Sequence, residues 1–244
     1  MKIILKLLLL LAFLSYLIFA FARLVGGRDE TKCTAVNVVI ADSVHSGFIT
    51  QEEVVRLLDA TGLNPVGKEM EDINGDTIEQ TLLKNTFIKL AKCYKTPGGR
   101  VNIHVAQRLP IIRVMAANGD DYYVDSNGYF MKPKEYNADL VVATGDISRQ
   151  YARDKLLDLA RYLHDHEFAN DLITQVNVDT QKRVDLVPRI GCQTIHLGQL
   201  DSATVVSQLA NLHAFYSKVL PTVGWNTYRE ISLEYTNQIV CKKY

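Results

Sequence analysis

The hydrophobic positions at the start of the chain form one almost unbroken run. Residues 7–22 carry no charge, and the run reaches back to residue 3 when the Lys6 ammonium extends to the lipid headgroups. A run of this length predicts a membrane segment. Ala20-Phe21-Ala22 has the small-x-small form of a signal-peptidase site, so the residues fit either a retained anchor or a cleaved signal peptide. Both interpretations export the rest of the chain.

The next part of the chain, residues 31–107, shows the pattern of a small mixed domain. Alternating apolar residues predict a strand over 34–44, and Thr50-Gln-Glu-Glu53 has the spacing of a capping box that opens a helix. A second helix is predicted over 76–90, and a turn at 97–99 leads into another strand. These elements predict one compact strand-helix-helix-strand unit.

Residues 108–244 show a second pattern, richer in strands. Asn-Gly pairs at 118–119 and 127–128 indicate hairpin turns, and residues 174–198 supply two or three strands. Helices are predicted over 148–171 and over 201–220, the latter stopping at Pro221. The chain is therefore predicted to be an α+β protein whose second half is a mostly antiparallel β-domain with flanking helices.

The last residues alternate as one half-buried strand. One face carries Ile231, Leu233, Tyr235, Ile239 and Cys241, and the other carries Ser232, Glu234, Thr236, Gln238 and Lys242. Only Asn237 and Val240 interrupt the alternation, and Thr236-Asn237-Gln238 suits a turn or bulge. A last strand has no following chain to pair with, so we expect one side of its backbone to stay open.

The charge distribution argues against nucleic-acid binding, and the cysteines raise the question of disulfides. The first 28 residues hold Lys2, Lys6, Arg23 and Arg28 and no acid, which leaves 23 basic against 27 acidic residues afterwards and no nucleic-acid footprint. Outside the cytoplasm the four cysteines are able to form disulfides. The division into two domains favours the pairs Cys33–Cys93 and Cys192–Cys241, and free buried thiols are the alternative.

Motifs for catalysis or metal binding are weak. Asp72-Ile-Asn-Gly-Asp76 starts like a calcium loop but has Leu83 at the twelfth position, and histidines at 164 and 166 are two apart where zinc ligands on a helix are four apart. We therefore predict no cofactor, no metal and no small-molecule substrate. An exported hydrolase with a non-local site, using His104, His164 or Cys192, is the alternative function.

Several segments together resemble the bacterial cell-division family FtsQ/DivIB. The order of parts agrees over nearly the whole chain, and four segments stand where the family has its recurring motifs: Gln107-Arg-Leu-Pro110, Val124-Asp-Ser-Asn-Gly128, Leu197-Gly198 and Ile231 to Val240. The last strand departs from the family pattern at Ser232, Glu234 and Gln238, where the family has aspartate, arginine and glycine. We therefore expect backbone contacts rather than these side chains to bind a partner.

The resemblance implies a domain organisation, a location and a role. It implies a cytoplasmic tail at 1–6, a retained transmembrane helix at 7–25, a linker at 26–30, a POTRA domain at 31–107 and an FtsQ-type β-domain at 108–244. The N-terminus would lie inside and the bulk in the periplasm, at the division septum, as a single-pass inner-membrane protein.

The resemblance also implies a non-catalytic scaffold. Such a protein docks FtsB/FtsL-like coiled-coil proteins on its C-terminal edge strand by β-augmentation and links them to the septal peptidoglycan synthase complex. The expected partner-binding residues are Leu233, Tyr235, Thr236, Asn237, Gln238, Ile239, Val240, Cys241 and Lys242.

Overall fold

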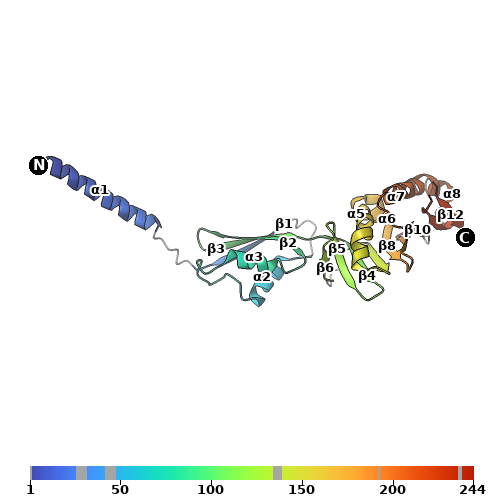
Figure 1. Ribbon diagram of the computed structural model, residues 1–244, viewed down its shortest axis with the longest axis horizontal. Helices are drawn as coiled ribbons and strands as arrows, with labels where there is room; N and C mark the ends of the chain where they lie inside the picture. Colours follow the sequence, from blue (N-terminus) through green and yellow to red (C-terminus); the bar gives the residue numbers. More distant parts are fainter. Residues whose placement is uncertain (1, 26–31, 42–47, 134–138, 192, 236–237) are drawn as a thin grey trace. The chain divides into compact units, whose positions relative to one another are not determined.

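The computed structural model describes residues 2–25, 32–41, 48–133, 139–191, 193–235 and 238–244 (Figure 1). The predicted linker at 26–30 lies outside these ranges. The chain begins with helix α1 (Lys2–Val25) and divides into two compact units, the first of residues 1–42, 50–84 and 90–106 and the second of residues 43–49, 85–89 and 107–244. Within the described residues, no helix combines the length with the apolar character that crossing a bilayer requires.

The first unit contains two helices and a three-stranded sheet. In chain order the elements are β1 (Ala35–Ala41), α2 (Gln51–Ala60), α3 (Gly75–Leu82), β2 (Ile88–Thr96) and β3 (Arg100–Gln107). β3 lies between β1 and β2, and β1 runs parallel to β3. The helices lie along the sheet and bury Val54, Leu58, Ile78 and Leu82 (Figure 1).

A local sequence signal explains where α2 begins, whereas the predicted end of the second helix has to be corrected. The capping box is confirmed, because Glu53 N donates to Thr50 Oγ1 (3.2 Å) and Thr50 N donates to Glu53 Oε2 (3.1 Å). The prediction of a helix through residue 90 is wrong, since α3 ends at Leu82 and β2 begins at Ile88. Asn85 forms the turn between them, with its side chain accepting from Phe87 N at 2.9 Å.

The second unit is built on a nine-stranded sheet with the order β12-β11-β10-β9-β8-β7-β4-β5-β6. Its strands are β4 (Pro110–Ala116), β5 (Asp121–Asp125), β6 (Phe130–Met131), β7 (Val142–Gly145), β8 (Ile173–Val178), β9 (Arg183–Pro188), β10 (Thr194–Gln199), β11 (Tyr228–Ser232) and β12 (Val240–Lys243). Five of the eight strand pairings are antiparallel, and β4–β7, β7–β8 and β10–β11 are parallel. The sheet is therefore mixed, with antiparallel pairs in the majority.

Two helical segments accompany this sheet. The first comprises α4 (Arg149–Tyr151), the π-helical η2 (Ala152–Leu156), α5 (Leu157–Asp165) and α6 (Glu167–Leu172), and the second comprises α7 (Val205–Ala214), η3 (Phe215–Val219) and α8 (Leu220–Val223). The first breaks at His166, whose extended backbone separates α5 from α6. The predicted stop at Pro221 is wrong by one turn, because a proline in the first turn of α8 has no intrahelical bond to lose.

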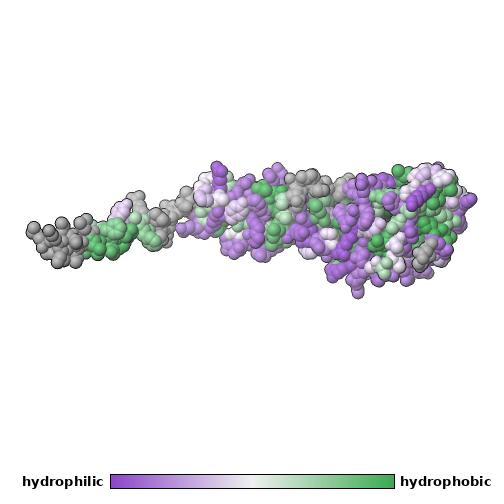
Figure 2. Space-filling model, turned by 90° about the horizontal axis from the view of Figure 1, so that it is seen from above, coloured by the Kyte–Doolittle hydropathy of each residue, from purple (hydrophilic) through white to green (hydrophobic). Residues whose placement is uncertain are grey.

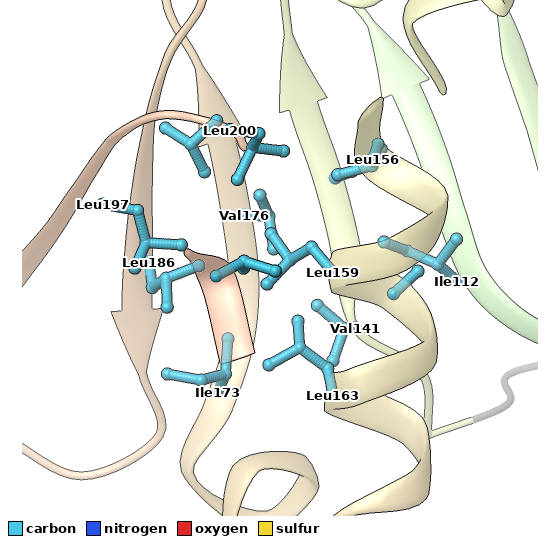
Figure 3. Packing of buried hydrophobic residues seen from close by; sticks show 14 of the residues in the cluster. Ile112, Val141, Leu156, Leu159, Leu163, Ile173, Val176, Leu186, Leu197 and Leu200 are labelled. Carbon is cyan, nitrogen blue, oxygen red and sulfur yellow. The ribbon is translucent and has the colours of Figure 1, made fainter. Parts of the chain in front are cut away.

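The core of the second unit lies between the helices and one face of the sheet. Leu156, Leu159 and Leu163 point from η2 and α5 toward Ile112, Val176 and Leu186 of the sheet (Figure 3), and none of the six is more than 1% exposed. Replacing one such leucine by alanine typically costs about 2–5 kcal/mol of stability. This packing fixes the sheet, and therefore fixes where its two edges lie.

Candidate docking edge

The C-terminal residues form a hairpin: the predicted last strand is divided into β11 and β12, with the predicted turn or bulge region between them. β11 and β12 pair antiparallel, with Ile231 opposite Cys241 and Ser232 opposite Val240, and Gln238 N donates to Tyr235 O (3.4 Å) across the turn. Residues directly opposite in a hairpin point to the same face, so alternation continues through the reversal. For that reason the sequence pattern could not distinguish a hairpin from a single strand.

β12 is the outermost strand of the sheet. It pairs with β11 on one side, and no other strand of the described chain pairs with its second side. β11 in turn lies parallel to β10, with Ile195 beside Ile231. An uncovered edge strand presents backbone donors and acceptors to any extended chain that arrives.

Apolar side chains hold the hairpin to the core. Ile231 is fully buried, Leu233 is buried, and Ile239 and Cys241 pack against the same cluster. Gln208 of α7 ties the end of β11 to β10, because its Nε2 donates to Leu197 O (3.1 Å) and to Leu233 O (2.9 Å). The hairpin is thus fixed from its inner face and leaves its other face free.

The other face of the hairpin is exposed and lightly charged. Val240 is 47% exposed, and Lys242 Nζ lies 3.5 Å from Glu230 Oε1 in a pair whose side chains are 59% and 38% exposed. An exposed ion pair of this kind contributes about 0–1 kcal/mol. Lys242 therefore adds little to the stability of the fold and is accessible to a partner.

A groove lies beside the hairpin, next to α7. It has a cavity volume of about 80 Å³ and is lined by Thr204, Ser207, Gln208, Asn211, Leu233, Glu234, Tyr235 and Gln238. Its amide and hydroxyl groups suit a peptide segment better than a small molecule, which prefers an enclosed apolar cavity. Sequence reasoning missed the α7 residues, since polar positions on a helix carry no signal of what lies beside them.

The motif residues at 107–110 and 124–128 have an internal role. Arg108 Nη1 lies 2.8 Å from Asp125 Oδ2, with the two side chains 15% and 4% exposed. Asp125 Oδ1 accepts from Asn127 N (2.9 Å) and Tyr129 N (2.8 Å), and the Arg108 guanidinium stacks 3.9 Å above the Tyr129 ring. Gln107 Oε1 accepts from Ile49 N (3.3 Å). Arg108 and Asp125 thus stabilise the β5–β6 turn from within, and Gln107 binds the backbone at Ile49.

Comparison with known families agrees with both halves of this architecture. The family described as FtsQ/DivIB, C-terminal related, matches residues 109–242, and the POTRA-like domain family matches residues 31–106. The chain belongs to the FtsQ/DivIB family. No curated protein sequence matches it. Members of the FtsQ/DivIB family are division proteins, generally non-catalytic, so membership indicates a scaffold role within a division complex.

The residues expected to bind a partner of this FtsQ/DivIB protein fall into distinct environments. Tyr235, Gln238, Val240 and Lys242 are exposed, while Ile239 and Cys241 are half-buried and Leu233 is buried. Thr236 and Asn237 lie outside the described residues. The exposed four are therefore the side chains with which a partner has room to make contact, and that contact stays a prediction.

The cysteines carry free thiols in the described part of this FtsQ/DivIB chain. Cys33, Cys93 and Cys241 are free, and Cys192 lies outside the described residues. Cys33 lies just before β1 and Cys93 lies on β2, with β3 between these two strands of the sheet. Burial raises the pKa of Cys93 to about 11 and also raises that of Cys241, which keeps both thiols protonated.

Of the three residues named for the alternative hydrolase, His104 lies in the first unit, His164 lies in the second, and Cys192 lies outside the described residues. His104 Nε2 shares a 2.8 Å hydrogen bond with Tyr94 OH, and His164 is exposed near the end of α5. His196 Nδ1 lies 2.6 Å from Asp185 Oδ1 on neighbouring strands, an arrangement that orients a base. No serine or cysteine nucleophile is bonded to it within the described chain, so this pair alone gives no support to the hydrolase.

Proposed function

We propose that the protein is a non-catalytic, bitopic scaffold of the division complex. Residues 7–25 anchor it in the inner membrane with the bulk in the periplasm, at the septum. Its β12 edge adds a short strand of an FtsB/FtsL-like coiled-coil protein, and through that protein it is linked to the septal peptidoglycan synthase complex. The single observation that carries the docking proposal is that β12 ends the sheet with one side unpaired.

The anchor proposal rests on α1. Its 24 residues span about 36 Å at the rise of an α-helix, against about 30 Å for the hydrocarbon core of a bilayer. Most of its described side chains are apolar and exposed, including Leu10, Phe13, Leu17 and Phe21, and the face of the helix seen in Figure 2 is mostly hydrophobic. Exposed apolar side chains in this number are stabilised by a nonpolar environment, which a membrane supplies.

The docking proposal rests on the backbone of β12. An added strand would bond to the open side of β12, and the groove lined by Asn211, Tyr235 and Gln238 offers polar groups to a part of the partner that extends beyond the strand. Lys242 and Lys243 at the same edge discourage pairing with a second copy of β12, because like charges would then lie close together.

Paired proline substitutions test strand addition. Successive N–H groups of a strand point to opposite sides, so Val240→Pro and Cys241→Pro each remove a donor from a different side of β12. We expect the variant that loses the outward donor to stay folded and to bind the purified coiled-coil partner at least about tenfold more weakly. The inward variant should instead destabilise the hairpin. Val240→Thr, which keeps the backbone donor, is the matched control.

Two outcomes decide the proposal. If both proline variants stay folded and bind the partner as tightly as the unmodified chain, strand addition at β12 is wrong. In cells, replacing the protein with the outward-donor variant should give filaments with unfinished septa, and normal division with that variant would contradict the scaffold role.

A further inference from the structure

Two arginines gather over aromatic rings at the sheet edge opposite β12. The Arg149 guanidinium lies 5.0 Å from the centre of the Tyr122 ring and 5.4 Å from that of Phe130, and the Arg153 guanidinium lies 5.0 Å from the same Phe130 ring. Phe130 belongs to β6 and meets Tyr122 edge to face at 5.1 Å. Two cations therefore share one aromatic platform.

Arg149 and Arg153 have fewer or more distant carboxylate partners than most other arginines of the second unit. Six other arginines have a carboxylate oxygen within 4.0 Å: Arg108, Arg113, Arg161, Arg183, Arg189 and Arg229. Arg149 reaches only Asp120, at 3.8 Å in an exposed pair, and Arg153 has no carboxylate at that distance among the described residues. The two arginines thus have one exposed carboxylate partner between them, and Arg153 has none at that distance in the described chain.

The physical chemistry of this pair favours an anionic ligand. Two guanidiniums on consecutive turns of one helical segment repel each other until a negative group lies between them. Stacking on Phe130 restrains both side chains, which lowers the conformational entropy that binding has to remove. A guanidinium donates two parallel hydrogen bonds to a carboxylate, a geometry that lysine does not offer.

We propose that Arg149 and Arg153 bind carboxylate side chains of an acidic segment in a second protein of the division complex. Family membership makes a protein the expected occupant, since division scaffolds assemble with other proteins. β6 and β12 end the same sheet on opposite sides, eight strand spacings apart, which is about 38 Å. A short strand added to β12 does not span that distance, so the arginine pair is a separate surface.

A labelled acidic peptide tests the proposal on the full chain in nonionic detergent. The probe is fluorescein-labelled hexaglutamate, with hexaglutamine as the uncharged peptide, measured by anisotropy at low salt. We expect the double variant Arg149→Gln/Arg153→Gln to bind hexaglutamate about tenfold more weakly, as the loss of two exposed charge-assisted pairs implies. Arg149→Lys/Arg153→Lys should recover only part of the loss, because it restores charge without paired donors.

Lys155→Gln is the matched control. It removes one charge two residues from Arg153, from an exposed lysine with no ion pair in the described chain, and should leave binding unchanged. Equal binding by the double glutamine variant, or an equal loss in Lys155→Gln, would overturn the proposal. Loss of binding to phosphatidylglycerol vesicles with hexaglutamate binding unaffected would overturn it in favour of a lipid headgroup site. Val240→Pro should bind hexaglutamate normally, which separates this surface from β12 docking.

Discussion

The two edges of the nine-stranded sheet are built in opposite ways. β6 has two residues, and the chain leaving it is held by its own unit, where Lys132 N donates to Thr86 Oγ1 (3.4 Å). The turn before it is fixed from within by the buried Arg108–Asp125 pair. β12 has four residues, exposes Val240, and is fastened only on its core face. The β6 edge is therefore closed by internal contacts, whereas the β12 edge is open to pairing with another strand.

The difference shows how one sheet separates stability from recognition. A short edge with internal polar contacts cannot accept another strand, which protects the protein from unwanted pairing. A longer edge held from its inner face keeps its shape while its backbone stays accessible. Substitutions in the buried contacts of the β5–β6 turn should therefore change the free energy of unfolding, and substitutions on the outer face of β12 should change association with little effect on folding.

The largest expected effect lies at the closed edge. Asp125→Ala removes a buried carboxylate that binds Arg108 and two backbone N–H groups, and should lower the free energy of unfolding by about 3–5 kcal/mol. Urea denaturation followed by circular dichroism measures it. Asp121→Ala is the control, since Asp121 pairs with Arg113 in a more exposed position (32% against 4%) and should cost about 1 kcal/mol. Equal losses would show that the buried pair does not close this edge.

The second effect tests how the open edge is fastened. Gln208→Ala leaves the carbonyls of Leu197 and Leu233 without their donor and should cost about 2 kcal/mol, with faster hydrogen exchange at Leu233 N–H. Asn211→Ala, on the same helix and the same groove, should change stability by less than about 0.5 kcal/mol. Unchanged exchange at Leu233 in Gln208→Ala would contradict a fastening role for Gln208.

Local patterns predicted much of this architecture, and contacts between distant residues account for the rest. The capping box at Thr50 and the turn at Asn118-Gly119 depend on neighbouring residues, so they could be read from the sequence. The sequence could not show whether the C-terminal residues form one strand or a hairpin, because the alternation of apolar and polar residues continues through the turn. The groove residue Gln208 and the arginine pair over Phe130 depend on segments that only the fold brings together. The sequence therefore predicted the C-terminal strand of the docking edge, but not the residues from other segments that lie beside it.

A smaller effect is expected at Tyr122, which lies on β5 beside the closed edge. Its hydroxyl is buried without a hydrogen-bond partner in the described structure, and burial raises its pKa from 10.0 to about 12. Tyr122→Phe should raise the free energy of unfolding at neutral pH by about 1 kcal/mol, because an unpaired hydroxyl is costly to bury.

The same substitution predicts a pH dependence. The native state keeps the Tyr122 proton up to about pH 12, whereas the unfolded chain loses it near pH 10. The contribution of this pKa difference to the free energy of unfolding is therefore fully present below pH 10 and is lost as the pH rises toward 12. Tyr122→Phe should lack that loss, and the difference between the two proteins should grow between pH 10 and 12. Parallel pH curves would show that the hydroxyl ionises equally in both states.

The smallest effect on folding is expected at the open edge, where the effect on association should be the largest. Lys242→Thr/Lys243→Thr removes one exposed pair with Glu230 and should change the free energy of unfolding by no more than about 0.5 kcal/mol. Without these charges two copies of β12 are able to pair edge to edge, so sedimentation should show concentration-dependent dimers that Lys155→Thr does not form. A monomeric double variant would mean that something other than charge protects β12. Dimers would show that the lysines keep an otherwise accessible backbone for an oppositely charged or uncharged partner strand.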